Sequence, residues 1–379
     1  MPRYLPVVLK EGIRMARRAR RVRRDGFHQH KGTPEETCKA IIDRAYDKRR
    51  GYFRVSTGNF CEFYSRDFGL SCEALQELGY GERVKSTLAY ALSHYESAGK
   101  VTTAIDPRGV PFDYFLPAGP DALGFLLYAI THTGNNHLAA KHNEFLQRAI
   151  DRAAEEFVDP KTLLPRADRH FSSIRDQARR KGACYDAVMI AVIAREAHRL
   201  GFRFPYKEHA VTKAIIKAYW NGTYFFQDLT REPIVTGDAN VFPFWTGIVK
   251  NKRMMEDAID AVRAAGLDDP FPLRYVSELD AAREKTSLHI VNLLSKDYES
   301  HSIWMHLGLA YLRMLMKRDA DAARRHLKRY GQLIRQHRTF LEVYDTTGEP
   351  FMRTFYAADE SMVWCANWLV LTRNGEDKT

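Results

Sequence analysis

Cysteines and long apolar runs are scarce in this sequence. Five cysteines occur among 379 residues. Because they form no CxxC pair, reduced thiols are expected instead of a disulfide framework or a zinc site. No run of about 18 apolar residues is present, so no membrane span is predicted. The basic residues of 1–24 follow a short apolar stretch, which is the reverse of a secretory signal. These absences predict a cytoplasmic protein.

Nucleotide-binding and metal-binding motifs are missing as well. The sequence contains neither GxxxxGK followed by Ser or Thr nor GxGxxG, so the usual glycine-rich phosphate loops are absent. It also lacks HExxH and the spacing of an EF-hand loop. We therefore expect no cofactor and no metal site.

The positive charge is concentrated at the N-terminus. Residues 1–31 contain ten Lys and Arg against Glu11 and Asp25, a balance of +8 out of a net +11. We therefore divide the chain into a basic arm, 1–32, and one domain, 33–379. The arginines could contact nucleic-acid phosphates, but no aromatic residues are interleaved with them. A solvated helix that covers a neighbour is favoured over nucleic-acid binding. The arginines concerned are Arg14, Arg17, Arg18, Arg20, Arg21, Arg23 and Arg24.

Apolar residues recur at helical spacing through most of the chain. A capping box with proline at the first helical position, 33–36, introduces the first predicted helix. Short pieces at 99–105 and 222–226 are expected to form small hairpins. The predicted helices cover 37–49, 69–78, 82–98, 120–133, 138–157, 184–200, 206–219, 240–249, 253–265, 302–316, 319–338 and 357–371.

These roughly twelve helices differ in how they distribute apolar residues. Segments 187–201 and 301–316 are apolar on nearly all sides, whereas 144–157 and 321–338 are amphipathic. A helix that is apolar all round must be enclosed, and an amphipathic helix can face water. Two concentric rings of six helices satisfy both demands. The predicted fold is therefore all-α, a single-domain (α/α)6 toroid.

Carboxylates and aromatic rings recur in the loops before the helices. Each aspartate taken alone is explained as a helix cap, but capping does not explain the aromatic neighbours. Sugars present C–H faces to aromatic rings and hydroxyls to polar groups, so this combination favours a carbohydrate pocket. The loop segments are 63–68, 112–121, 183–186, 236–240, 297–301, 340–345 and 355–359. Cleavage of a glycosidic bond needs two such carboxyls, an acid with a raised pKa and an ionised base.

The chain resembles the six-hairpin glycosidases, in particular the group that contains neutral invertases, mannosylglycerate hydrolases, processing glucosidase I and the glucosidase of glycogen debranching enzyme. The resemblance covers about residues 50–372. Its segments are Tyr64-Ser65-Arg66-Asp67-Phe68, Pro120-Asp121, Tyr185-Asp186, Gly237-Asp238-Ala239-Asn240, His301-Ser302-Ile303-Trp304 and Glu342-Val343-Tyr344-Asp345-Thr346-Thr347-Gly348. A double tryptophan often found in the family is replaced here by Gly124-Phe125-Leu126-Leu127.

The resemblance implies an inverting hydrolase of an O-glycoside, such as an α-glucoside or a related small glycoside or oligosaccharide. Its general acid would be Asp67 and its general base Glu342. The Arg66 side chain diverges from that of Asp67, so it is expected to bind another carboxylate or a sugar hydroxyl. The resemblance further implies a substrate-binding set, which comprises Tyr64, Arg66, Phe68, Asp121, Tyr185, Asp186, Asp238, Trp245, His301, Trp304 and Tyr344.

Two other classes of function remain open at this point. Sugar epimerases, isomerases and polysaccharide lyases also use helical toroids, and fold alone does not decide the chemistry. An epimerase of this kind would use paired histidines, for which His301 and His306 are candidates. The chain could also bind carbohydrate without turnover, or associate with nucleic acid through the basic arm.

Overall fold

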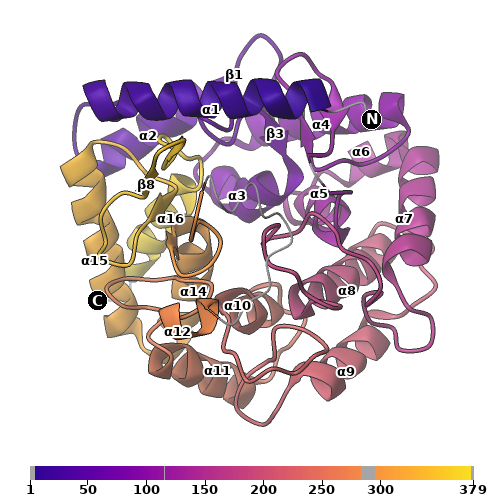
Figure 1. Cartoon of the computed structure of the whole chain (residues 1–379). Helices are drawn as coiled ribbons and strands as arrows, with labels where there is room; N and C mark the ends of the chain where they lie inside the picture. The colour runs from indigo at the N-terminus through magenta and orange to yellow at the C-terminus, as the bar shows by residue number, and fades with distance from the viewer. Residues whose placement is uncertain (1–4, 115, 283–294, 377–379) are drawn as a thin grey trace.

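Residues 5–114, 116–282 and 295–376 are described by the computed structural model of the chain. Twelve helices form two concentric rings around a central axis (Figure 1). The inner ring consists of α3 (Ser65–Glu77), α5 (Pro120–His132), α8 (Cys184–Arg199), α10 (Gly237–Trp245), α14 (Met305–Arg318) and α16 (Cys365–Glu376). The outer ring consists of α4 (Gly81–Ala98), α7 (Asn143–Phe157), α9 (Glu208–Tyr219), α11 (Lys252–Ala264), α15 (Ala320–His337) and α2 (Pro34–Ala45). This is the predicted (α/α)6 toroid.

The apolar pattern of each helix decides its ring. In α8, every residue from Cys184 to Ala197 is buried, and α5 is buried from Pro120 to Ile130. In contrast, α7, α11 and α15 bury one stripe and expose the other face. An enclosed helix needs apolar side chains all round, whereas an outer helix needs them on one side only.

The ring closes where the last hairpin meets the first. Helix α16 packs against both α3 and α2, and α15 also packs against α2. The amide of Asn367 donates to the carbonyl oxygen of Leu70 at 3.0 Å, and the amide N–H of Val363 donates to Val55 at 2.9 Å. Residues about three hundred positions apart thus complete the core.

Short antiparallel strand pairs join the loops at the end of the barrel where the inner helices begin, which we call the mouth. One sheet has the order β3 (Phe63–Tyr64), β4 (Ala104–Ile105) and β5 (Pro111–Phe112). Pairing of β6 (Ile303–Trp304) with β7 (Val343–Tyr344) brings together the loops before α14 and α16. The remaining pairs are β1 (Tyr46–Asp47) with β2 (Tyr52–Phe53), and β8 (Met352–Arg353) with β9 (Tyr356–Ala357).

Several predicted helix boundaries differ from the observed ones. The capping box is present, since the Glu36 amide donates to the Thr33 hydroxyl at 3.2 Å and the Thr33 amide donates to the Glu36 carboxylate at 2.8 Å. The helix predicted at 138–157 is divided at His142 into α6 (Asn136–Lys141) and α7. The helix predicted at 357–371 begins only at Cys365, because 357–364 pass through β9 and a loop.

The basic N-terminal segment forms α1 (Leu5–Asp25), which lies along the rim of the barrel (Figure 1). Ala19 and Val22 of α1 are buried in a small apolar cluster with Ala357 of β9. Arg18 is also buried, whereas Arg17 and Arg20 are exposed. The short helix α12 (Glu278–Ala281) lies in the loop before α14. No helix of the described residues is long and apolar enough to cross a membrane.

Candidate active site

A cavity of about 240 Å³ lies at the mouth, on the barrel axis. The loops that lead into the inner helices supply its walls, and Met15 of α1 contributes one side chain. Among the described residues of its lining, four carry carboxyl groups: Asp67, Asp176, Glu299 and Glu342. Its aromatic lining comprises Phe60, Tyr64, Tyr114, Tyr298, Trp304, Tyr356 and Trp364. The cavity therefore combines the acidic and aromatic groups that the loop composition predicts.

Five of the residues that the sequence assigns to a hydrolase site line this cavity, as does His306, an epimerase candidate. The five are Tyr64, Arg66, Asp67, Trp304 and Glu342. The phenol of Tyr64 is hydrogen-bonded to that of Tyr114, and their rings are stacked 6.2 Å apart. The Trp304 indole N–H donates to the carbonyl oxygen of Tyr298 at 2.7 Å. Residues 275 positions apart in the sequence, Asp67 and Glu342, thus share one cavity.

Asp67 lies in the first turn of α3, where its carboxylate complements the helix N-terminus. The indole N–H of Trp364 donates to Asp67 Oδ1 at 3.1 Å. Burial raises the pKa of Asp67 to about 6, although the Arg66 charge and the Trp364 hydrogen bond act in the opposite direction. As the diverging side chains predict, Arg66 pairs with another carboxylate: its Nε lies 2.7 Å from Asp121 Oδ2.

Glu342 immediately precedes β7 and is almost fully buried, with 1% of its surface exposed. The phenols of Tyr298 and Tyr356 donate to its two carboxylate oxygens, and the amide of Asp359 donates to Oε2 at 3.0 Å. Burial and the nearby Asp359 charge raise the pKa of Glu342 to about 7, against these hydrogen bonds. Three donors converge on the carboxylate, and they stabilise its ionised form.

The remaining two carboxyls of the cavity were not identified from the sequence as catalytic candidates. The Ser173 amide donates to Asp176 at 2.8 Å, and the Gln177 amide donates to Glu299 at 2.7 Å. Burial raises the pKa of Asp176, while burial and the Asp176 charge raise that of Glu299 to about 8. Two interacting carboxyls cannot both ionise easily, so this pair retains a proton near neutral pH.

The sequence around Asp176 and Glu299 does contain a signal that these residues belong to the site. Asp176 lies in the loop before the inner helix α8, as Glu342 lies before α16, and Glu299 belongs to the acidic and aromatic segment 297–301. Tyr298, Tyr356 and Trp364 also carry aromatic groups in such loops. Loop position alone does not tell which residue of a segment faces the axis, so these residues were missed.

The carboxyls of the cavity come from loops at different positions around the ring. The inner helices follow each other in chain order, from α3 through α5, α8, α10 and α14 to α16 (Figure 1). Asp176 lies in the loop before the third inner helix and Glu342 in the loop before the sixth, so the two loops are opposite. Asp67 begins the first inner helix, which is adjacent to the sixth.

Four predicted substrate ligands support the cavity from behind it. The Tyr185 phenol donates to Asp121 Oδ2 at 3.1 Å, and Asp121 in turn pairs with Arg66. The Ser173 hydroxyl donates to Asp186 at 2.5 Å, and burial raises the pKa of Asp186 to about 6. Asp238 forms a buried ion pair with Arg180 at 2.7 Å. None of Asp121, Tyr185, Asp186 and Asp238 is among the described residues that line the cavity.

The other predicted ligands are likewise not among the described residues that line the cavity. Phe68 packs against Phe63, and Tyr344 packs against Phe271 and His337. His301 lies 3.9 Å from the Asp297 carboxylate. Trp245 occupies the opposite end of the barrel, which we call the floor, where it contacts Tyr128 at a ring distance of 5.6 Å.

The floor contains a second hollow, of about 300 Å³. It is lined by residues of α3, α14 and α16, and by Trp245 at the end of α10. His306 lines both this hollow and the mouth cavity. Burial lowers the pKa of His306 to about 3, so its imidazole is neutral.

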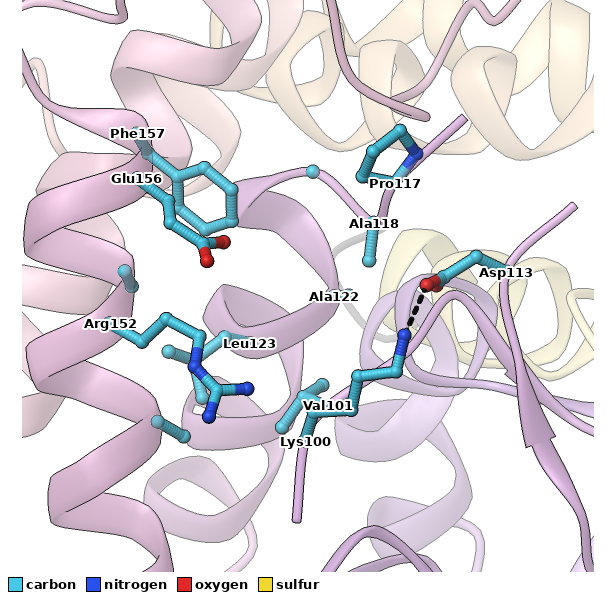
Figure 2. Close-up of a pocket in the computed structure, with 13 residues that line it drawn as sticks. Lys100, Val101, Asp113, Pro117, Ala118, Ala122, Leu123, Arg152, Glu156 and Phe157 are labelled. Atoms are coloured by element: carbon cyan, nitrogen blue, oxygen red, sulfur yellow. Dashed lines mark hydrogen bonds and ion pairs between the residues drawn. The ribbon is translucent and has the colours of Figure 1, made fainter. Parts of the chain in front are cut away.

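A third hollow, of about 230 Å³, lies between α5, α7 and the loop before α5 (Figure 2). Lys100 pairs with Asp113 across part of it at 2.8 Å, and Arg152 extends into it from α7 (Figure 2). Phe157 is the one aromatic residue among the described residues of its lining. This hollow therefore lacks the combination of several carboxyls and aromatic rings found at the mouth.

Comparison with known proteins identifies the fold. No protein-family model and no curated protein matches the sequence. A glycosidase variant in complex with glucose superimposes with a TM-score of 0.63 at 13% identity, over 97% of this chain and 98% of that one. The chain has the fold of the six-hairpin glycosidases. A GH63 mannosylglycerate hydrolase from Thermus thermophilus, in complex with glucose, matches with a TM-score of 0.54 at 11% identity, over 90% and 100%.

A larger structure also contains this fold. A rhamnosidase from Klebsiella oxytoca with rhamnose bound matches with a TM-score of 0.60 at 12% identity, over 90% of this chain. The chain spans 63% of the length of that rhamnosidase. At these identities the similarity establishes the toroid, and the argument for activity depends on the cavity itself.

Proposed function

We propose that this protein is a glycoside hydrolase that cleaves an O-glycosidic bond with inversion. The observation that carries the proposal is the mouth cavity, where buried carboxyls with raised pKa values face aromatic rings. Inverting hydrolysis needs a protonated carboxyl for the leaving oxygen and an ionised one that activates water on the opposite face of the sugar. Perturbed carboxyl pKa values in a cleft are a frequent mark of such sites.

Glu342 is proposed as the general base. It receives hydrogen bonds from Tyr298, Tyr356 and the Asp359 amide, and these donors hold the carboxylate in one orientation. They also favour the charged state that a base requires. The pKa of about 7 implies that activity rises as the pH passes through neutrality, because the base must first ionise.

Asp67 is proposed as the general acid on the strength of its motif and its pKa of about 6. Its Oδ1 accepts the Trp364 hydrogen bond, which leaves Oδ2 to carry a proton. A second candidate, Asp176, is favoured by its position, because its loop lies opposite that of Glu342 across the ring. An acid and a base that act on opposite faces of one sugar fit that arrangement. If Asp176 is the general acid, Asp67 would bind a sugar hydroxyl instead.

The proposed substrate is a small glycoside, an α-glucoside or a relative of it. The cavity volume of about 240 Å³ is below the ~300–1,000 Å³ that is common for ligand pockets. Two of the similar structures contain glucose and one contains rhamnose, so single sugars fit cavities of this fold. Trp304, Trp364 and Tyr114 offer ring faces or edges against which a sugar can pack.

A panel of glycosides with an NMR readout of the released anomer tests the proposal. Inverted product with the native protein, and none with Glu342→Gln, is the expected result. Retained configuration, or substantial turnover by Glu342→Gln, contradicts it. Glycosyl fluorides need no protonation of the leaving group, so they should restore activity to the variant that lacks the acid. Comparing Asp67→Asn with Asp176→Asn in this assay identifies which aspartate is the acid.

The cavity offers less support for an epimerase. Among the described residues, His306 is the one histidine in its lining, and His301 lies outside it. The His306 ring is packed beside Trp304 and Trp364 and has a pKa near 3, so it is a poor proton carrier at neutral pH. Release of a free sugar from a glycoside, with no epimer formed, distinguishes the two activities.

A further inference from the structure

Helix α1 is connected to the proposed general base through a buried chain of contacts. Arg18 of α1 has only 7% of its surface exposed. Its guanidinium donates to the carbonyl oxygens of Ala357 at 2.9 Å and Ala358 at 3.1 Å. It also lies 3.4 Å from Asp359 Oδ1 and forms a close ion pair with Glu360. Arg18 thus ties the N-terminal helix to β9 and to the loop that follows it.

Asp359 lies between this arginine and Glu342. The amide of Asp359 donates to Glu342 Oε2 at 3.0 Å, and the amide of Glu342 donates back to the Asp359 carbonyl at 2.9 Å. The Asp359 carboxylate accepts the amides of Asn59 at 2.7 Å and Phe60 at 3.0 Å. Any displacement of Asp359 therefore moves a donor of the proposed base.

The junction is packed too tightly for these contacts to be incidental. A Cβ atom at Gly58 would lie 1.9 Å from Asp359 Oδ1 and 2.9 Å from Arg18 Nε. The Asp359 side chain is fully buried, so it needs a compensating cation. Arg18 provides that cation.

We propose that Arg18 is a positioning residue of the active site, which holds Asp359 against the carboxylate of Glu342 from the outside of the barrel. This inference rests on the proposed role of Glu342 as the base. It makes α1 a component of the catalytic site rather than a detachable basic arm. Arg18 does not line the cavity and is not a catalytic residue.

Loss of the Arg18 charge is expected to change the pKa of Glu342 in one definite direction. The Asp359 charge raises the pKa of Glu342, and the Arg18 charge offsets that of Asp359. Removing Arg18 should therefore raise the pKa of Glu342 further, by roughly half a unit to one unit. Other titratable or charged groups that face Glu342 or share its cavity remain in place, namely Tyr298, Tyr356, Asp67, Arg66, Asp176, Glu299 and His306.

The test compares Arg18→Ala with Arg21→Ala in the full-length protein. Arg21 lies on the same helix and also pairs with Glu360, at 3.3 Å, but it is exposed and has no contact with Asp359. The carboxyl carbon of Glu342 is observed in protein carrying ¹³C-labelled glutamate, and is assigned by its absence from Glu342→Gln. Its titration should shift upward in Arg18→Ala and should stay within about 0.2 units in Arg21→Ala. An unshifted or downward-shifted titration in Arg18→Ala overturns the inference.

Two further measurements keep the result interpretable. Arg18→Lys retains the charge, so its titration should return toward that of the native protein. If Arg18→Ala fails to fold, Arg18→Lys is measured in its place. In that case Gly58→Ala, which disturbs the same junction, is expected to shift the titration of Glu342 upward. With an active p-nitrophenyl glycoside as probe, the acidic limb of kcat/KM should move with the NMR titration. Full turnover by Glu342→Gln would overturn the proposed function, while the ¹³C titration would still report on the link between Arg18 and Glu342.

Discussion

The mouth and the floor of the barrel both contain buried or half-buried carboxyls, but the pKa values of these carboxyls are shifted in opposite directions at the two ends. At the floor, burial raises the pKa of Glu73, but a hydrogen bond from His132 and the Arg313 charge outweigh it and lower the pKa to about 2. Glu196 is held near 2 in the same manner by His132 and Arg195. At the mouth, burial prevails, and the pKa values of Asp67 and Glu342 rise to about 6 and 7.

The difference lies in the supply of cations. Arg195 Nε lies 2.6 Å from Glu196, and Arg313 lies 2.7 Å from Glu73, so each floor carboxylate has a paired charge. At the mouth, Arg66, which is the arginine among the described residues of the cavity lining, pairs with Asp121 instead of with Asp67 or Glu342. A paired carboxylate stabilises the fold and is chemically inert, whereas an unpaired one costs stability and can exchange a proton. Four predictions test this contrast, in order of decreasing effect.

The largest effect is expected at the mouth, on catalysis. Glu342→Gln should lower kcat/KM for a hydrolysed glycoside by about 10³-fold, since loss of a general base typically costs 10²–10⁴. Circular dichroism should show an intact fold, because glutamine has the shape of glutamate: its amide oxygen can accept from one of the two phenols, and its NH2 group can donate to the oxygen of the other. A decrease of less than tenfold would show that the mouth carboxylate is no more reactive than those of the floor.

The second effect is expected at the floor, on stability. Glu196→Gln should lower the free energy of unfolding by about 3 kcal/mol, because the buried Arg195 loses its charged partner and His132 keeps only Glu73. Turnover per folded molecule should be unchanged. Denaturant unfolding combined with active-site kinetics at low temperature measures both. A change of less than 1 kcal/mol would contradict the role given to this ion pair.

The third prediction uses pH to distinguish the ends. The folded state raises the pKa of Glu342 above its usual value of about 4.5, so the group costs stability as the pH rises through 7. Glu342→Gln should therefore gain about 2 kcal/mol relative to the native protein between pH 5 and pH 8. For Glu196→Gln the sign is reversed, and its deficit should shrink as the pH falls from 5 toward 2. If the stabilities of the two variants, relative to the native protein, change with pH in the same direction, the contrast between mouth and floor carboxyls is wrong.

The smallest effect is expected from substitution of a tryptophan at the mouth, compared with one at the floor. Trp304→Phe should lower kcat/KM about tenfold, because the hydrogen bond to Tyr298, which contacts Glu342, is lost. Trp245→Phe should change it by less than about twofold, since Trp245 lies at the floor. Steady-state kinetics on one glycoside decides between them. Equal losses would indicate that the floor communicates with the mouth, and His306, which lines both hollows, would be the first residue to examine.

The sequence predicted the rings more completely than the site. Helix number and ring membership follow from local periodicity, and the all-round apolar character of 187–201 and 301–316 placed those segments inside correctly. The loops do not carry such a pattern. Trp245 and Trp304 are both predicted to bind substrate, yet they are at opposite ends of the barrel, because one ends α10 and the other precedes α14. Asp176 was missed because facing Glu342 across the ring is a property of the closed toroid, not of its own segment.

The closure of the ring has a consequence for how the protein is made on the ribosome. Trp364 and the loop that bears Glu342 and Asp359 emerge after the first five inner helices, yet they complete a wall begun by residues near 55–67. Until then, a nascent chain would carry an open crescent of helices whose flanks on α3 and α14 are exposed and apolar. Contacts with such long sequence separation form slowly. Synthesis of this protein would therefore pass through an aggregation-prone interval that ends only with the final hairpin, which is where demand for a chaperone should be greatest.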